Sequence, residues 1–246
     1  MKKRLLVLGL AFTMFAATAC GTSSDDGNKT SKADKTVTAT PNSDKTSETQ
    51  KNDDKKDDAK ESYKSADDIT MDDLKNHEET PAEDFKYRDK SNGEAVIKEY
   101  IGDDPIVVIP NEIDGKKVVD FGKIFTNNKD IVAVRVGDNV ENIKEGAFGN
   151  CDNLKYIILG KNVKVFEHGN VGGKKFEQLE LNDGLEQLGE EGTSGAVIIL
   201  NKDKVEVKIP ESVNHMAFTG AKTLIVKAGS YAESFAKEHN MDYRVE

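Results

Sequence analysis

The chain has 246 residues, of which 36% are hydrophobic and 33% are charged, and its formal net charge is −10. The acidic balance argues against DNA or polyanionic wall polymers as ligands, because such partners are held mainly by Lys and Arg. The polar residues are concentrated in the N-terminal third, so a folded domain is expected only in the rest of the chain.

The first 19 residues have the features of an export signal. A basic start precedes an apolar run from Leu5 to Ala17, which is shorter than the roughly 20 residues that a membrane-spanning helix needs. The sequence Ala17-Thr18-Ala19-Cys20 then resembles a bacterial lipobox, with Ala17 where leucine is most frequent. The resemblance predicts a lipoprotein signal peptide over 1–19 and lipidation of Cys20. The alternative is an ordinary signal-peptidase site beside an unmodified cysteine.

Residues 20–80 are predicted to form a lipid-anchored, disordered linker. From Gly21 to Thr80 the chain is rich in Ser, Thr, Lys and Asp, with 10 lysines against 16 acidic residues. So few apolar residues cannot offset the entropy lost on folding. Ile69, Met71 and Leu74 are compatible with a short helix, but the pattern is weak. The domain is expected at the extracellular face of the membrane of a Gram-positive bacterium, where two acyl chains on one cysteine would hold the protein firmly.

The folded domain is expected over residues 81–246, and it begins with a hairpin. Phe85 and Tyr87 alternate on one side of Ser91-Asn92-Gly93, and Ala95 and Ile97 alternate on the other side. An Asn-Gly pair between alternating apolar residues is a strong hairpin signal. This hairpin is expected to cap an open edge of the domain.

Five turns of one shape follow the hairpin. In each, an apolar strand residue is followed by Pro, Gly or Asn, by two polar residues and by another apolar residue. The turns are Ile109–Ile113, Val136–Val140, Leu159–Val163, Leu181–Leu185 and Ile209–Val213. Successive turns start 27, 23, 22 and 28 residues apart. Such a period predicts a β-solenoid of short parallel strands, with insertions looping out of the longer coils.

The unit from Ile131 to Leu159 is the most complete copy, and it resembles the BspA-like leucine-rich repeats of bacterial surface proteins. The match lies in Gly146-Ala147-Phe148, Cys151 and Leu154, and in the Ile-Pro pairs that open the first and last turns. It extends over about residues 85–243. The resemblance implies a leucine-rich-repeat solenoid. The third and fourth copies depart from it at 172–176 and 192–196, so irregular turns are expected there.

A helix is expected to close the far end of the domain. Ser230 can cap it, and Tyr231 and Phe235, with Ala232 and Ala236, would form its apolar side. Asn240 can end the helix in the left-handed conformation before a short final strand over 241–245.

No catalytic, metal-binding or cofactor-binding constellation is predicted. The histidines at 77, 168, 215 and 239 have no ligand-spaced neighbours. Cys151 with His168 could be posed as a nucleophile and its base, but Cys151 occupies a buried position of the repeat, where cysteines are usually inert. With Cys20 lipidated, Cys151 has no partner for an intrachain disulfide.

The remaining candidate site is a surface. Since side chains alternate along a strand, residues between the buried ones should line one exposed sheet face. The predicted binding residues on this face are Arg135, Tyr156, Ile158, Glu180, Glu206 and Lys208.

The sequence therefore predicts a lipid-anchored surface protein that binds a protein or glycan partner without catalysis, for example in adhesion. The alternatives are a structural envelope lipoprotein without a specific ligand and, with less support, a wall-active enzyme. The pattern does not indicate the oligomeric state.

Overall fold

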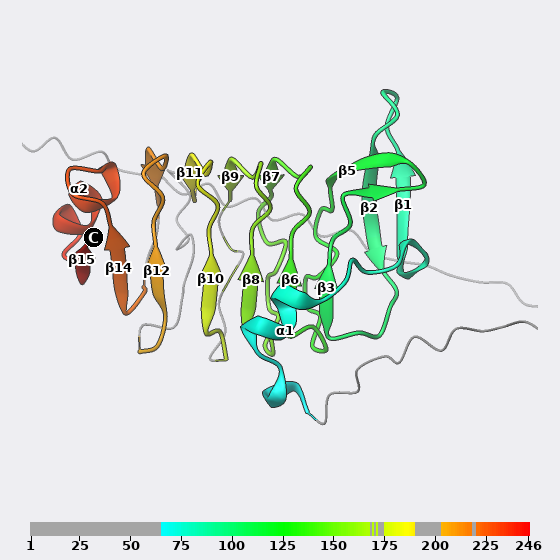
Figure 1. Cartoon of the computed structure of the whole chain (residues 1–246), viewed down its shortest axis with the longest axis horizontal. Coiled ribbons are helices and arrows are strands. Elements are labelled where there is room, and N and C mark those ends of the chain that lie inside the picture. The colour runs from blue at the N-terminus through cyan, green and yellow to red at the C-terminus, as the bar shows by residue number, and fades with distance from the viewer. Residues whose placement is uncertain (1–64, 168, 170, 172–174, 190–202, 218–219) are drawn as a thin grey trace, which may run out of the picture. The chain divides into compact units, whose positions relative to one another are not determined.

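The computed structural model describes residues 65–167, 169, 171, 175–189, 203–217 and 220–246 (Figure 1). The predictions about the signal peptide, Cys20 and the linker up to residue 64 lie outside the described residues, as do those about His168 and the turns at 172–174 and 192–196. The fold below is that of the repeat domain alone.

Four short parallel strands form the main sheet of the solenoid. They are β3 (Ile106–Val108), β6 (Ala133–Arg135), β8 (Tyr156–Ile158) and β10 (Gln178–Glu180), in the spatial order β10-β8-β6-β3. Their register aligns the central residues of all four strands in one buried row: Val107, Val134, Ile157 and Leu179. The predicted repeat period thus yields a parallel-strand β-solenoid, with one strand from each coil.

A second parallel sheet follows the turns. It consists of β7 (Asn142–Ile143), β9 (Val165–Phe166), β11 (Gln187–Leu188) and β13 (His215–Met216). Each strand has two residues, and the second residue of each is buried: Ile143, Phe166, Leu188 and Met216. These apolar residues lie three positions after each repeat turn, so the alignment of the copies in the sequence is confirmed.

The main sheet is interrupted after β10. The next strand, β12 (Glu206–Lys208), pairs with β14 (Thr223–Val226), which pairs with β15 (Tyr243–Val245). Strands β10 and β12 lie side by side in Figure 1 but belong to different hydrogen-bonded sheets. The interruption falls within the longest repeat spacing, between Leu181 and Ile209.

The predicted hairpin caps the first coil. Strands β1 (Phe85–Asp89) and β2 (Ala95–Tyr100) are antiparallel, and Gly93 in their turn has a φ of 80°. Two further strands, β4 (Glu112–Ile113) and β5 (Lys116–Asp120), complete a sheet of order β1-β2-β5-β4. In the core next to this sheet, phenylalanine rings of successive coils pack in a row. The ring centroids of Phe125 and Phe148 are 5.6 Å apart, and those of Phe148 and Phe166 are 6.4 Å apart.

The expected closing helix is α2 (Tyr231–Glu238), and the Ser230 hydroxyl accepts a hydrogen bond from the Glu233 amide at its start. Ala232, Phe235 and Ala236 are buried as expected, whereas Tyr231 is 39% exposed and does not belong to the buried side. Asn240 has a φ of 53°, which confirms the left-handed end of the helix before β15.

The ordered domain starts earlier than predicted. Ahead of residue 81 lie a short 3-10 helix, η1 (Ala66–Asp68), and α1 (Met71–Asn76); a second 3-10 helix, η2 (Ala82–Asp84), leads into β1. Thr70 and Asp73 form a reciprocal capping box at the start of α1. Residues ahead of the predicted boundary at residue 81, from Ala66 to Thr80, therefore also pack with the solenoid. The Asp-rich composition of this segment does not predict an ordered helix. A helix of six residues is stabilised by packing against the sheet and not by its own helix propensity.

Candidate functional site

The predicted binding residues lie on the outer side of the main sheet, in two rows. Arg135, Ile158 and Glu180 are aligned across β6, β8 and β10, and Tyr156 belongs to the neighbouring row. Glu206 and Lys208 lie on β12, beyond the interruption of the sheet. The structure thus brings the first three together, and it places the last two on an adjacent strand that is not hydrogen-bonded to β10.

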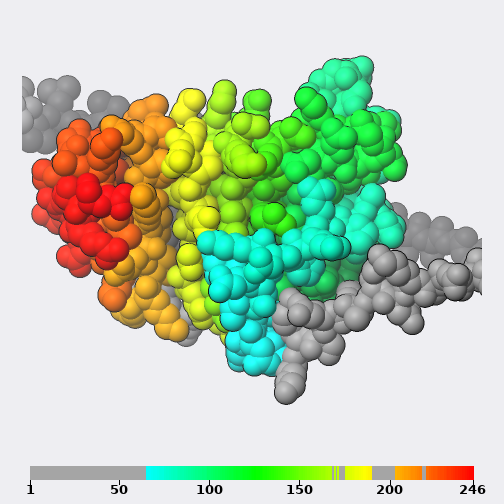
Figure 2. All heavy atoms as spheres, in the orientation of Figure 1, coloured from blue at the N-terminus to red at the C-terminus, as the bar shows by residue number. Residues whose placement is uncertain are grey.

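Part of this face is covered by the chain itself. We call residues 65–80 the N-terminal strap; Figure 2 shows this segment, in cyan, lying across the coils coloured green. The Ile69 and Leu74 side chains of the strap are fully buried, and Tyr156 beneath them is only 7% exposed. The expectation that Tyr156 would be exposed is therefore corrected.

Apolar contacts beneath the strap form a cluster of their own. Ile69 and Leu74 pack against outward-facing residues of the strands, namely Ile106, Val108, Val132, Ala133 and Tyr156. None of these residues belongs to the cluster that fills the inside of the solenoid. The sequence signal for this contact is the apolar character of Ile106, Val108 and Ala133 at outward strand positions, which are usually polar when a sheet face is open to solvent.

Two cations of the sheet bind main-chain carbonyls of the strap. Arg135 donates from Nη2 to the His77 carbonyl at 2.6 Å, and Lys155 donates from Nζ to the Ile69 carbonyl at 3.1 Å. Lys155 is 6% exposed and also lies 3.7 Å from a Glu177 carboxylate oxygen. A buried charge needs such partners, because its desolvation is otherwise costly.

The C-terminal end of the strap is joined to the first coil. Thr80 donates its amide to the Val108 carbonyl at 3.1 Å, and its hydroxyl accepts the Val108 amide at 2.9 Å. The neighbouring Glu79 carboxylate accepts the side-chain amide of Asn111 at 2.9 Å. The strap therefore continues the edge of the sheet at β3.

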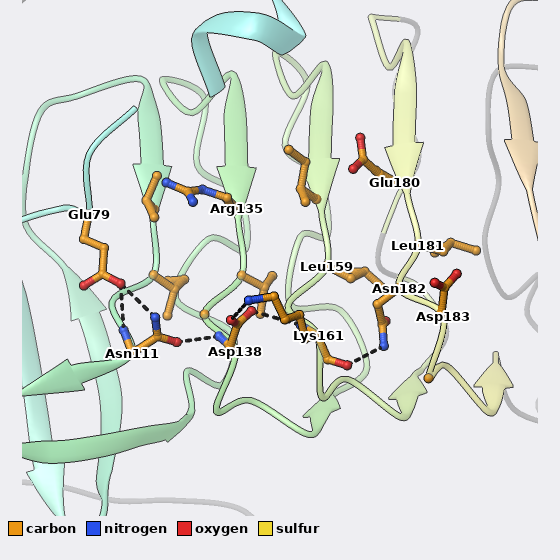
Figure 3. Close-up of a pocket in the computed structure, with 16 residues that line it drawn as sticks. Glu79, Asn111, Arg135, Asp138, Leu159, Lys161, Glu180, Leu181, Asn182 and Asp183 are labelled. Atoms are coloured by element: carbon orange, nitrogen blue, oxygen red, sulfur yellow. Dashed lines mark hydrogen bonds and ion pairs between the residues drawn. The ribbon is translucent and has the colours of Figure 1, made fainter. Parts of the chain in front are cut away.

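An open groove of about 600 Å³ lies beside the strap, where the strands of the main sheet end (Figure 3). Its floor includes Leu159 and Leu181, and polar side chains from successive turns surround it: Glu79, Asn111, Arg135, Asp138, Lys161, Glu180, Asn182 and Asp183. The groove crosses four coils because each coil contributes the residues that follow its strand.

A ladder of hydrogen bonds builds the wall of this groove. The side-chain amides of Asn139, Asn162 and Asn182 donate to carbonyls of the preceding coil, at Asn111, Asp138 and Lys161 respectively. The coils approach so closely here that a Cβ on Gly137 would lie 2.7 Å from the Ile109 carbonyl oxygen. Packing against the preceding coil therefore requires glycine at position 137.

A second hollow of about 420 Å³ lies between β10 and β12 and shares Glu180, Leu181 and Asp183 with the groove. Glu206 and Lys208 line this second hollow, so both remain at an accessible surface. They form ion pairs with the C-terminal strand region: Arg244 Nη1 lies 2.7 Å from Glu206, and Lys208 Nζ lies 2.5 Å from Glu246.

Three charged groups at the strap and groove have pKa values that are shifted from their ordinary values. A hydrogen bond to Asp104 raises the pKa of His77 against the opposing effect of burial. For Asp138, burial acts to raise the pKa, but hydrogen bonds from the Lys161 side chain and backbone outweigh it, and the pKa is lowered. A hydrogen bond and charge attraction from Glu180 raise the pKa of Lys75, at an ion-pair distance of 2.8 Å. Asp138 and Lys75 are therefore charged at neutral pH.

Cys151 lies in the core as predicted for a repeat position. It is 4% exposed, its Sγ lies 2.8 Å from the Phe125 carbonyl oxygen, and burial raises its pKa to about 11. A thiol that stays protonated is a poor nucleophile. Among the residues that the structure describes, no group of three or more His, Cys, Asp or Glu side chains is arranged to hold a metal ion. Within the same residues, no helix has the length and apolar character that crossing a membrane requires.

Solved structures show what this fold resembles. A leucine-rich-repeat protein of T. pallidum matches with a TM-score of 0.51 and 25% identity, over 60% of this chain and 71% of the other. A leucine-rich cell surface protein of Faecalibacterium prausnitzii matches with a TM-score of 0.35 and 16% identity, over 58% and 53% of the two chains. A leucine-rich-repeat protein of Bacteroides ovatus matches with a TM-score of 0.41 and 17% identity, over 58% of this chain and 48% of the other.

No protein-family model and no curated protein matches the sequence. The argument from known proteins therefore concerns the fold, and it rests on the T. pallidum protein. Together with the stacked parallel strands, it shows that the described domain is a β-solenoid of the leucine-rich-repeat type, with bacterial leucine-rich-repeat proteins as structural neighbours.

Proposed function

We propose that this protein is a BspA-like, lipid-anchored module at the extracellular face of a bacterial membrane, and that it binds a protein or glycan without catalysis. The observation that carries the proposal is the groove across the strand ends, continued by the hollow between β10 and β12. A ligand lying across both would contact several coils at once, which is how solenoids use their extended surfaces.

The groove suits a polar ligand with small apolar parts. Its carboxylates and amides, such as Asp138, Asp183 and Asn182, can bind hydroxyl or amide groups, while Leu159 and Leu181 offer apolar contact. The binding surface proposed from the sequence therefore loses Tyr156 and extends over Glu180, Glu206, Lys208 and the groove, which Arg135 and Ile158 also line.

A binding screen with a charge reversal in the shared part of the two hollows tests this function. The purified chain without its signal peptide is immobilised and presented with host matrix proteins and purified wall glycans. Asp183→Arg should abolish any binding that the wild type shows, because Asp183 lines both hollows. The matched reversal Glu238→Arg lies on α2, outside both hollows, and should bind like the wild type. Equal binding by both variants would reject the groove, and silence across the panel would favour the structural envelope protein.

A further inference from the structure

The outer face of β3, β6 and β8 has the chemistry of a polypeptide-binding surface. Arg135 and Lys155 bind the strap through main-chain carbonyls, and Thr80 exchanges two hydrogen bonds with Val108. Only two side chains of the strap, Ile69 and Leu74, are buried and hydrophobic. Surfaces that bind extended or helical peptides typically combine hydrogen bonds to the peptide main chain with a few pockets for its side chains.

The strap is separable from the solenoid. Its apolar contacts form a cluster that shares no residue with the inner core. Helix α1 has six residues, which is too short to be stable without the surface beneath it. Opening the strap would therefore leave the packing of the coils in place and expose Tyr156, Ile106 and Ala133.

The strap also leaves one donor of the face unused. Arg135 Nε is buried and has no hydrogen-bond partner among the described residues, although Nη2 of the same side chain binds the His77 carbonyl. An unpaired buried donor costs free energy, so a segment that pairs with this donor could bind the face with a more favourable free energy than the strap does. A different segment that offers an acceptor to Nε would gain that bond.

We propose that this face is a peptide-binding surface, that the strap is its resident ligand in cis, and that a segment of similar chemistry from another protein displaces it. The partner is a short acidic segment that forms one or two helical turns and carries two aliphatic side chains five positions apart, as Ile69 and Leu74 are. One of its acidic residues would lie beside Lys175, which pairs with Asp67 while the strap is docked, and a basic residue would take the place of Lys75 beside Glu180. Because a tethered strap competes at a millimolar effective concentration, the partner gains access only when the strap opens.

The test uses the chain from residue 20 and a fluorescein-labelled synthetic peptide of residues 65–80. Ile69→Ser with Leu74→Ser removes both apolar anchors of the strap and leaves the face intact. This variant should bind the peptide at least about tenfold more tightly than the wild type, in which the strap competes. Asp72→Ser, at an exposed position of α1, is the matched control and should behave like the wild type.

Adding Lys155→Met to the anchor variant should weaken peptide binding again, because the partner of the Ile69 carbonyl is lost while the aliphatic stem is kept. Failure of the folded anchor variant to bind the peptide, or equal binding by the wild type, would overturn the proposal. The test measures neither ligand binding in the groove nor lipid anchoring, so this failure would leave the proposed function standing.

Hydrogen exchange of the wild type decides the question if the anchor variant does not fold. The amides of Leu74 and Thr80, bonded to Thr70 and Val108, should exchange through a local opening in which Val136 and Leu159 stay protected. Exchange of all four amides only on global unfolding would show that the strap is an integral part of the core, which would overturn the proposal.

Discussion

Arg135 donates a hydrogen bond of 2.6 Å to the backbone carbonyl of His77, across 58 positions of sequence. This bond joins the second coil of the solenoid to the strap. A residue predicted to offer its side chain to a partner thus already binds a main-chain carbonyl of its own chain. The accessible part of the surface lies beyond it, at Glu180, on β12 and in the groove.

The buried Leu74 side chain should carry much of the docking of the strap. We expect Leu74→Ala to lower the free energy of strap opening by about 2–5 kcal/mol, the usual cost of removing a buried leucine side chain. The midpoint of global unfolding should change little, because Leu74 lies outside the inner core. Limited proteolysis within residues 65–80 measures the opening, and Asp72→Ala serves as the control. Equal lowering of the global stability would contradict a separable strap.

Docking of the strap should depend on the protonation of His77. Its Nε2 lies 3.5 Å from an Asp104 carboxylate oxygen, and the hydrogen bond to Asp104 raises the pKa of the imidazole above 6.5. A raised pKa in the docked state means that the stabilisation is complete below about pH 6.5 and is lost as the pH rises through the docked-state pKa. Arg135, which also faces His77, acts in the opposite direction.

Exchange of the Thr80 amide, corrected for its intrinsic pH dependence, should therefore show more frequent opening at pH 8 than at pH 5.5. His77→Gln should remove this difference. Opening that is the same at both values in the wild type would show that the ion pair with Asp104 does not contribute.

Close contact between coils should make Gly137 intolerant of a side chain. A Cβ there would lie 2.7 Å from the Ile109 carbonyl oxygen, and backbone cannot move aside as a side chain can. We expect Gly137→Ala to reduce the free energy of unfolding by about 1–3 kcal/mol in urea titrations. Gly184→Ala, whose Cβ would come no closer than 3.4 Å to a neighbour, should be nearly neutral. Similar losses for both variants would reject this account of the turn.

The lipid anchor proposed at Cys20 has its own test. Cells grown with an alkyne analogue of palmitate should label the wild-type protein and leave Cys20→Ala unlabelled and shed into the medium. Cys151→Ala should keep the label, since its thiol is buried in the core. Absence of label on the wild type, or label that persists in Cys20→Ala, would reject the anchor.

The solenoid could be predicted because its signal repeats. Val134, Ile157 and Leu179 occupy equivalent positions of the repeat and align in one buried row, so one error of register would have broken the whole pattern. The hairpin at Gly93 and the helix cap at Ser230 were also predictable, since each depends on local residue chemistry.

The strap could not be predicted in the same way. Its stability comes from contacts with residues 106–156 that are distant in sequence, and its own composition is that of a solvated linker. Tyr156 illustrates the consequence, because strand alternation correctly places it on the outer face but does not reveal that another segment covers that face. The groove could not be predicted for a related reason. Its polar residues belong to the turns, and the sequence pattern identifies these turns only as the ends of the repeated strands.

Covering of the outer face by the strap can be measured directly by hydroxyl-radical footprinting of the intact chain. Tyr156 is 7% exposed and Tyr231 is 39% exposed, so in the wild type Tyr156 should be oxidised several-fold more slowly. In the variant with Ile69→Ser and Leu74→Ser the two rates should approach each other. Oxidation of Tyr156 as fast as Tyr231 in the wild type would contradict the account, because the outer face would then be open.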